Sequence, residues 1–168
     1  MSDAILQIRD LVVGFDTDAG RVVAVDGVNL DAPRGKTLGI VGESGCGKSV
    51  TAFSINRLLP QPSGKILGGS IRFEGRELTN LPIDEIRHLR GKEIGMIFQE
   101  PMTALNPVHR IGRQLAEAIL LHEPNVPPSE VLQRSVKMLE QVRIPSPGER
   151  IEAYPHQLSG GMRQRVMI

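Results

Sequence analysis

Eight residues beginning at Gly42 place the strongest constraint on this chain of 168 residues. They read Gly-Glu-Ser-Gly-Cys-Gly-Lys-Ser and satisfy the P-loop pattern GxxxxGK[ST], in which glycines let successive backbone N–H groups curl around phosphate oxygens. Residues 36–41 (KTLGIV) are an apolar run typical of a buried parallel strand, and residues 48–59 have helical composition up to Pro60. Strand, loop and helix in this order predict a phosphate site at a helix N-terminus.

Each polar group of the loop has a task in this interpretation. Lys48 reaches the β- and γ-phosphates, and the Ser49 hydroxyl ligates Mg²⁺. The alternative is an accidental glycine-rich turn, but average residue usage gives roughly one chance match in a hundred or more chains of this length. We therefore predict that nucleotide phosphate is bound by Gly42, Glu43, Ser44, Gly45, Cys46, Gly47, Lys48, Ser49 and Val50.

Apolar periodicity predicts a β segment at the start of the chain and helices towards its end. We expect strands at residues 4–15, 21–32, 70–73 and 94–98. We expect helices at residues 83–89, 111–122 and 131–142, and one that opens at 159–161. Ser129 is expected to cap the helix at 131–142. The pattern predicts an α/β protein.

Composition excludes several classes of protein. The 20 Lys and Arg residues against 19 Asp and Glu give a net charge of +1, which provides no electrostatic case for binding nucleic acid. The single cysteine, Cys46, excludes an internal disulfide framework and a cysteine-based zinc site. No apolar run approaches the roughly 18 residues of a membrane span, and the N-terminus does not resemble a signal peptide. We expect a cytoplasmic protein.

A second glycine-rich turn lies near the end of the chain, where residues 157–165 read QLSGGMRQR. Ser159 suits a helix N-cap, and Gly160 and Gly161 expose N–H groups at a helix start. Alone, this could equally be an ordinary loop. After a P-loop, it resembles the signature motif of the ATP-binding cassette (ABC) ATPases. The resemblance implies a head-to-tail dimer, in which Ser159, Gly160 and Gly161 of one subunit close over ATP held by the P-loop of another.

Two further positions match the ABC family. Gln99, at the end of the expected strand 94–98, matches the glutamine that in the family contacts Mg²⁺ and the attacking water. Phe15 matches the aromatic residue that stacks on adenine. An ordinary surface glutamine and an ordinary core phenylalanine are the alternatives. The resemblance implies ATP and Mg²⁺ as cofactors, catalytic roles for Lys48 and Gln99, and metal contacts for Ser49 and Gln99.

A longer pattern resembles one subfamily, the dipeptide, oligopeptide, nickel and glutathione importers of bacteria. It consists of residues 42–51, residues 99–107 (QEPMTALNP) and residues 154–157 (YPHQ). The implied partners are two membrane permease subunits, a second ABC ATPase subunit and, indirectly, an extracytoplasmic solute-binding protein, with no nucleic acid. The implied location is peripheral, on the cytoplasmic face of the bacterial inner membrane. Residues 100–107 and the helix from Ile111 would form the groove for a permease helix.

The resemblance also implies how the chain is divided. Residues 1–100 or so would form a P-loop core with an antiparallel β subdomain, and residues 101–168 the Q-loop and a helical signature subdomain. In the family, a strand ending in Asp-Glu follows, and its Glu is the general base. Residues 22–26 and 81–85 look similar but precede the signature. We therefore expect these 168 residues alone to hydrolyse ATP poorly and to associate through an open apolar sheet edge.

Three other readings stay open at this point. The first is a non-hydrolytic fragment that binds nucleotide or permease only. The second is a non-transport ABC ATPase of translation or DNA repair, which residues 99–107 and the near-neutral charge disfavour. The third is a small-molecule kinase, which would have no use for the signature. The transported solute, and whether the partner ATPase is a second copy or a sibling chain, are also open.

Overall fold

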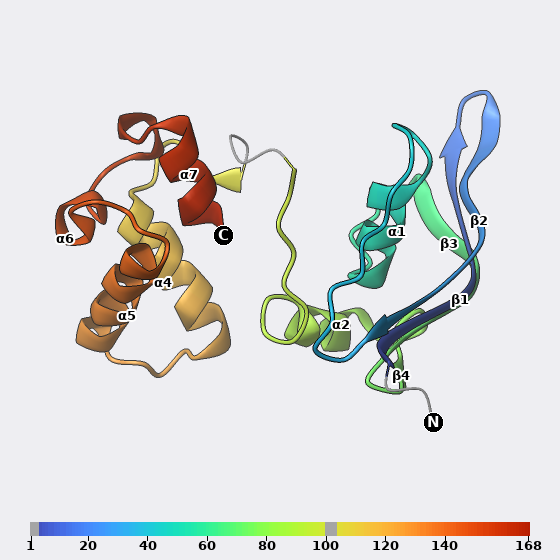
Figure 1. Cartoon of the computed structure of the whole chain (residues 1–168), viewed down its shortest axis with the longest axis horizontal. Helices are drawn as coiled ribbons and strands as arrows, with labels where there is room; N and C mark the ends of the chain where they lie inside the picture. The colour runs from blue at the N-terminus through green and yellow to red at the C-terminus, as the bar shows by residue number, and fades with distance from the viewer. Residues whose placement is uncertain (1–3, 100–103) are drawn as a thin grey trace. The chain divides into compact units, whose positions relative to one another are not determined.

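A computed structural model describes residues 4–99 and 104–168 of the chain. The chain divides into two compact units, Met1–Ile94 and Gly95–Ile168 (Figure 1). The first unit holds the β-sheet, and the second is helical. Each is described below by itself.

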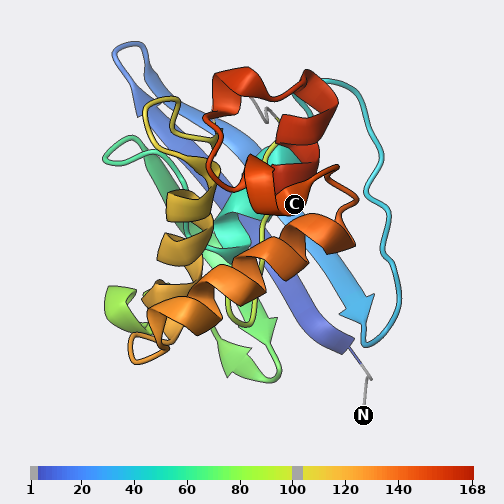
Figure 2. The same ribbon diagram turned by 90° about the vertical axis from the view of Figure 1, so that its left-hand side faces the viewer.

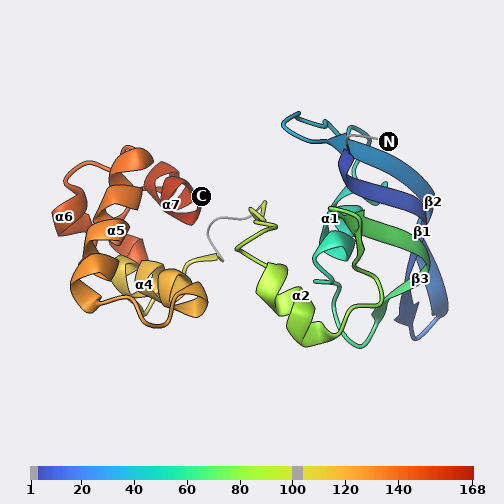
Figure 3. The same cartoon turned by 90° about the horizontal axis from the view of Figure 1, so that it is seen from below.

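An antiparallel sheet with the strand order β2-β1-β3-β4 forms one side of the first unit (Figures 1 and 3). Strands β1 (Ala4–Thr17) and β2 (Gly20–Pro33) form a long hairpin, so the two strands predicted at the start of the chain are confirmed. Strand β3 (Gly64–Phe73) begins earlier than predicted, because Gly64 and Gly68 pair with β1 through their backbones. Strand β4 is short (Arg76–Glu77).

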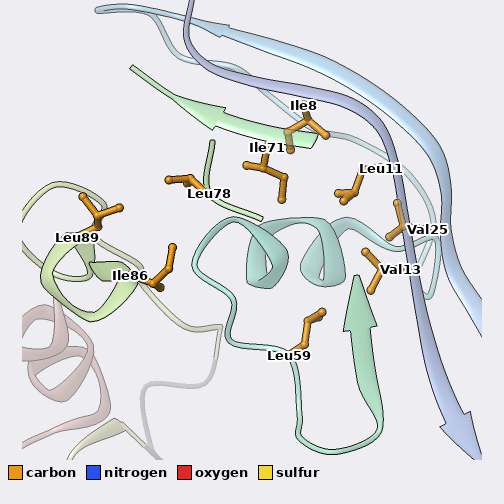
Figure 4. Packing of buried hydrophobic residues seen from close by; sticks show 9 residues of the cluster. All are labelled: Ile8, Leu11, Val13, Val25, Leu59, Ile71, Leu78, Ile86 and Leu89. Atoms are coloured by element: carbon orange, nitrogen blue, oxygen red, sulfur yellow. The ribbon is translucent and has the colours of Figure 1, made fainter. Parts of the chain in front are cut away.

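The core of this unit lies between the sheet and two helices, α1 (Lys48–Ile55) and α2 (Ile83–Leu89). Figure 4 shows the buried side chains around α1, which include Ile8, Leu11 and Val13 from β1 and Ile71 from β3. Each such side chain contributes about 1.5–3 kcal/mol when it is removed from water. This packing fixes the position of α1, and therefore of the loop that precedes it.

Two of the predicted strands, at residues 36–41 and 94–98, are wrong for this structure. Residues 36–41 and 95–98 have no regular secondary structure, and Ile94 makes only an isolated bridge with Arg90. Their apolar side chains are exposed, with Val41 92% and Ile97 60% accessible. Apolar composition favours a buried strand only when other strands lie alongside it, and within the described residues none pairs with either segment.

Helices make up the second unit, as predicted (Figure 2). Helices α4 (Ile111–His122) and α5 (Pro128–Gln141) pack together and are joined by residues 123–127. The short α6 (Pro147–Arg150), a 3-10 turn (Pro155–Gln157) and α7 (Gly160–Met167) complete the unit. Their shared core consists of Ile111, Leu139, Ile144, Ile151, Leu158 and Val166.

Two helix ends differ from the prediction. Helix α1 ends at Ile55 rather than near Leu59, because Arg57 adopts a left-handed backbone conformation and Leu59 turns into the core. The predicted cap at Ser129 is also wrong. Helix α5 already begins at Pro128, since proline is preorganised for the first helical position, and Pro127 is the N-cap.

Within residues 4–99 and 104–168, the helices are all too short or too polar to cross a membrane.

Candidate functional site

The P-loop joins residues 36–41 to α1 in a conformation that requires glycine. Gly45 has φ of +85° and Gly47 has φ of +91°, values that side chains disfavour. At Gly47 a Cβ atom would also lie 2.6 Å from the Ala24 carbonyl oxygen of β2. The C-terminal end of the loop, at Gly47, therefore lies directly against Ala24 of β2. Helix α1 begins at the next residue, Lys48, as the motif predicts.

Lys48 is the first residue of α1, and its ammonium group lies over the loop. Its Nζ donates hydrogen bonds to the carbonyl oxygens of Gly42 (2.7 Å) and Glu43 (2.6 Å), and lies 3.5 Å from Cys46 Sγ. Both carbonyls belong to the loop itself. The ammonium group is thus held where an anion cradled by the loop would meet it.

The start of α1 has the properties of a phosphate site. Gly47 is the N-cap and carries no side chain, so the first N–H groups of α1 are left for a ligand. The first turn of α1 contains no acidic residue that would repel an anion, and Ser49 beside it is exposed. Backbone donors, a helix N-terminus and an ammonium group suit a polyphosphate, and the Ser49 hydroxyl suits a hard cation bound to it.

The second glycine turn forms the start of α7. Ser159 is its N-cap, and the Ser159 Oγ accepts a hydrogen bond from the N–H of Met162 (3.3 Å), as the sequence predicts. Gly160 and Gly161 are exposed, and a Cβ added at either would have no described atom within 4 Å. Neither has a positive φ. Within the described part of the chain, neither steric crowding nor backbone conformation requires glycine at these two positions.

Residues before this turn hold it in place. Leu158 is 3% exposed and belongs to the helical core. The Tyr154 N–H donates to Gln157 Oε1 (2.8 Å), and the Gln157 N–H donates to the Tyr154 carbonyl oxygen (2.9 Å). The YPHQ segment thus forms a closed turn that leads directly into Ser159.

Phe15 lies near the tip of the β1–β2 hairpin and pairs with Val22 and Gly64. Its ring packs partly against the core of the first unit. The next residue, Asp16, accepts hydrogen bonds from Arg21 Nε (2.7 Å) and Lys65 Nζ (2.6 Å). These bonds, first from Arg21 and then from Lys65, lower the pKa of Asp16 to about 2. Asp16 thereby links β1, β2 and β3 beside Phe15.

This linkage predicts a pH effect. Because the pKa of folded Asp16 is below its ordinary value of 3.8, its contribution to stability is present above that value and is lost as pH falls towards 2. We expect the urea midpoint of the protein to fall more between pH 4.5 and pH 2.5 than that of Asp16→Asn. Equal falls would contradict this assignment. Since Asp16 is exposed, the difference should be small.

Gln99 belongs to the second unit and is exposed. The next four residues, 100–103, lie outside the described residues. The structure therefore assembles the predicted site as two groups, each within its own unit. Glycines and Lys48 meet in the P-loop, and Ser159, Gly160 and Gly161 meet at the start of α7.

Sequence analysis missed a groove on the second unit. Leu120 and Leu132 lie in the apolar rows of their helices, and they are 39% and 51% exposed. Together with Ala116 and Val131 they line an apolar groove of about 390 Å³ between α4 and α5, with Arg113 and Glu152 among its polar lining. The signal was present in α5, because Val131, Ser135 and Leu139 form its buried row and Leu132 lies one position beside that row.

Two arginines of α7 were also missed. Arg163 Nε donates to the Leu158 carbonyl oxygen (3.0 Å), and Arg165 reaches the backbone at the end of α5. No sequence pattern distinguishes these side chains from ordinary surface arginines.

Comparison with known proteins matches the arrangement to one family. Residues 25–168 match the family model described as "ABC transporter". The chain is 52% identical over 167 residues to the oligopeptide transport ATP-binding protein OppD of Escherichia coli, covering 99% of this chain and 49% of that protein. It is 49% identical over 166 residues to the dipeptide transport ATP-binding protein DppD of Bacillus subtilis, with coverages of 99% and 49%. The chain spans about half the length of these curated relatives.

Solved structures agree on the fold. The dimeric structure of MJ0796, a bacterial ABC transporter cassette, superposes with a TM-score of 0.83 at 24% identity, covering 97% of this chain and 67% of that chain. A post-hydrolysis dimer of the same cassette, bound to ADP and Pi, has a TM-score of 0.82 at 23% identity, with coverages of 96% and 66%. This likeness confirms the predicted fold class.

Proposed function

The chain belongs to the ABC transporter family, and on that premise we propose that it is the ATP-binding part of a subunit that powers uptake of peptides or related small solutes. The observation that carries this proposal is that one chain contains both motifs. Lys48 bonds to the P-loop carbonyls, and Gly160 and Gly161 of the signature turn have no described atom within 4 Å of their Cβ sites. Curated relatives with about half their residues identical are named for oligopeptide and dipeptide transport.

In this proposal the P-loop holds the phosphates of ATP. The amides of residues 44–49 donate to phosphate oxygens, and Lys48 exchanges its two carbonyl contacts for the β- and γ-phosphates. By the family resemblance, Ser49 and Gln99 would hold Mg²⁺, which would neutralise charge that develops on the transferred phosphate. Phe15 stacks on adenine from the hairpin tip that Asp16 braces. Lys48 and Gln99 are the catalytic candidates among these residues.

The signature turn acts on the ATP of a second ABC ATPase subunit in a head-to-tail dimer. Support comes from the exposed positions of Gly160 and Gly161, with no described atom near their Cβ sites, and from their place in the first turn of a helix, which suits an anion. The cassette that superposes on this chain was solved as a dimer. Residues 1–100 or so are proposed as the nucleotide core and 101–168 as the helical subdomain.

The groove between α4 and α5 receives a helix of a membrane permease. Its lining is largely apolar, and Leu120 and Leu132 at its walls are exposed. Binding there keeps the subunit at the cytoplasmic face of the membrane, with a solute-binding protein acting on the far side. The location expected from the sequence, residues 100–107 with the helix from Ile111, stays a prediction; Leu105 and Ile111 line a second cavity there, of about 540 Å³.

The groove predicts the effect of a charge at Leu132. We expect Leu132→Glu to weaken binding of the complete protein to its permease by at least about tenfold, because a carboxylate would be buried against an apolar helix. MgATP affinity should stay unchanged. Binding is measured by titrating the protein onto permease in nanodiscs. The matched control is Met138→Glu, which places the same charge at an exposed apolar position of α5 outside the groove.

Uptake by cells tests the importer assignment itself. Deleting the gene should abolish uptake of a labelled tripeptide, and restoring it should recover uptake. Parallel assays with glutathione and Ni²⁺ decide among the solutes that the subfamily transports. Unchanged uptake of all of these solutes in the deletion strain would contradict the proposal.

A further inference from the structure

The arginines of α7 face the protein rather than solvent. Arg165, half-buried, donates from its guanidinium to the carbonyl oxygens of Val142 (3.2 Å) and Arg143 (2.5 Å). Both acceptors lie immediately after α5. Two hydrogen bonds from one guanidinium thus connect the signature helix to the end of another helix.

The end of α5 is well suited to receive a cation. Carbonyl groups at a helix C-terminus lack partners within the helix and carry partial negative charge. The last turn of α5, which the structure describes in full, contains no basic residue. Arg143 adopts φ of +57° and brings Ile144 into the core, where Ile144 is 3% exposed. Arg165 therefore adds a positive charge from α7 at the carbonyl oxygens of Val142 and Arg143, which follow the last turn of α5.

The other end of α5 forms the groove. Val131, Leu132 and Ser135 lie within the first eight positions of this 14-residue helix and line the groove between α4 and α5. A helix of that length spans about 21 Å. One rigid element thus has the groove at its start and the Arg165 contact at its end.

We propose that Arg165 is a positioning residue, which fastens the signature turn to α5 so that the groove helix and the signature turn move as one body. The proposal rests on the proposed function, because it concerns the placement of Ser159, Gly160 and Gly161 over ATP in a partner subunit. Arg163 secures the turn locally through Leu158, whereas Arg165 makes the connection to α5.

This role predicts that loss of Arg165 lowers ATP turnover without weakening MgATP binding. The P-loop belongs to the first unit and Arg165 to the second, so nucleotide affinity of the isolated subunit should not depend on Arg165. Turnover needs the signature turn correctly placed. We therefore expect Arg165→Gln to leave the Kd for MgATP within about twofold and to lower kcat of the assembled transporter about tenfold.

The test uses the complete protein and two companion variants. Arg165→Lys keeps a cation at the end of α5 and should recover kcat to within about threefold of wild type. Arg134→Gln removes a half-buried arginine of α5 that pairs with Glu123 and Glu130, and should leave both Kd and kcat unchanged. Hydrogen exchange provides a readout without activity. Amides of residues 158–166 should exchange about tenfold faster in Arg165→Gln.

Three results would overturn the proposal. They are unchanged exchange and kcat in Arg165→Gln, parallel loss of affinity and turnover, and failure of Arg165→Lys to recover more turnover than Arg165→Gln. If Arg165→Gln does not fold, Arg165→Lys is tested instead. Its amides at residues 158–166 should exchange faster than those of wild type but by less than tenfold, and its Kd for MgATP should be that of wild type; wild-type exchange or a weaker Kd would overturn the proposal. A wild-type protein without ATPase activity would instead contradict the proposed function, and the exchange experiment would still test Arg165.

Discussion

Replacing Lys48 with alanine in the complete protein is expected to lower MgATP hydrolysis by at least about a hundredfold, because it removes a positioned cation from the charge that develops in the transition state. The structure gives this residue no other task of comparable weight. Its two hydrogen bonds go to carbonyl oxygens of the loop, and each is worth only about 1 kcal/mol. The melting temperature should therefore change little.

Lys137→Ala provides the matched control for this experiment. Lys137 is an exposed residue of α5, and its replacement by alanine changes the net charge by the same amount as Lys48→Ala. Initial rates of phosphate release at saturating MgATP measure the effect. A Lys48→Ala protein that hydrolyses ATP within about fivefold of wild type would show that the loop does not perform the chemistry assigned to it.

Replacing Gly161 with alanine is expected to move stability and activity in opposite directions. Alanine favours a helix over glycine by up to about 1 kcal/mol, and its Cβ would have no described atom within 4 Å in this chain. Unfolding should therefore require more denaturant. Hydrolysis should nevertheless fall by about tenfold or more, because the added methyl occupies space that the ATP of a partner subunit needs.

Gly148→Ala is the control for Gly161→Ala. Gly148 follows Pro147 at the start of α6, so it is the second residue of its helix, as Gly161 is in α7. It is likewise exposed, with open space around its Cβ position. It should gain similar stability and keep full activity. Full activity in Gly161→Ala would contradict the role of the signature turn in trans.

Local patterns of the sequence predicted those parts of the fold that form within a short stretch of chain. The hairpin of β1 and β2 follows from apolar periodicity and the turn between two adjacent strands. Helices α4 and α5 follow from rows of apolar residues, and Ser159 caps α7 through a contact three residues away. Each of these elements finds its hydrogen-bond partners close by in the sequence.

The failures concern interactions that periodicity does not encode. Residues 36–41 were predicted as a strand from their apolar side chains, but a strand also needs a neighbour, and none among the described residues lies beside it. Apolar rows on α5 also do not reveal that Leu132 is 51% exposed, because periodicity does not say how much of a helix face its neighbours cover. Arg165 gives no pattern at all, since its partners are backbone carbonyls of distant residues.

Equilibrium binding of nucleotides to the complete protein tests the central claim, that this P-loop recognises the outer phosphates of ATP. Isothermal titration calorimetry with MgATP, ADP and AMP separates the contributions of base and phosphates. We predict that ATP and ADP bind, that AMP binds at least about tenfold more weakly, and that Lys48→Ala removes the difference between ATP and AMP. Equal affinity of the wild-type protein for all three nucleotides would contradict the account.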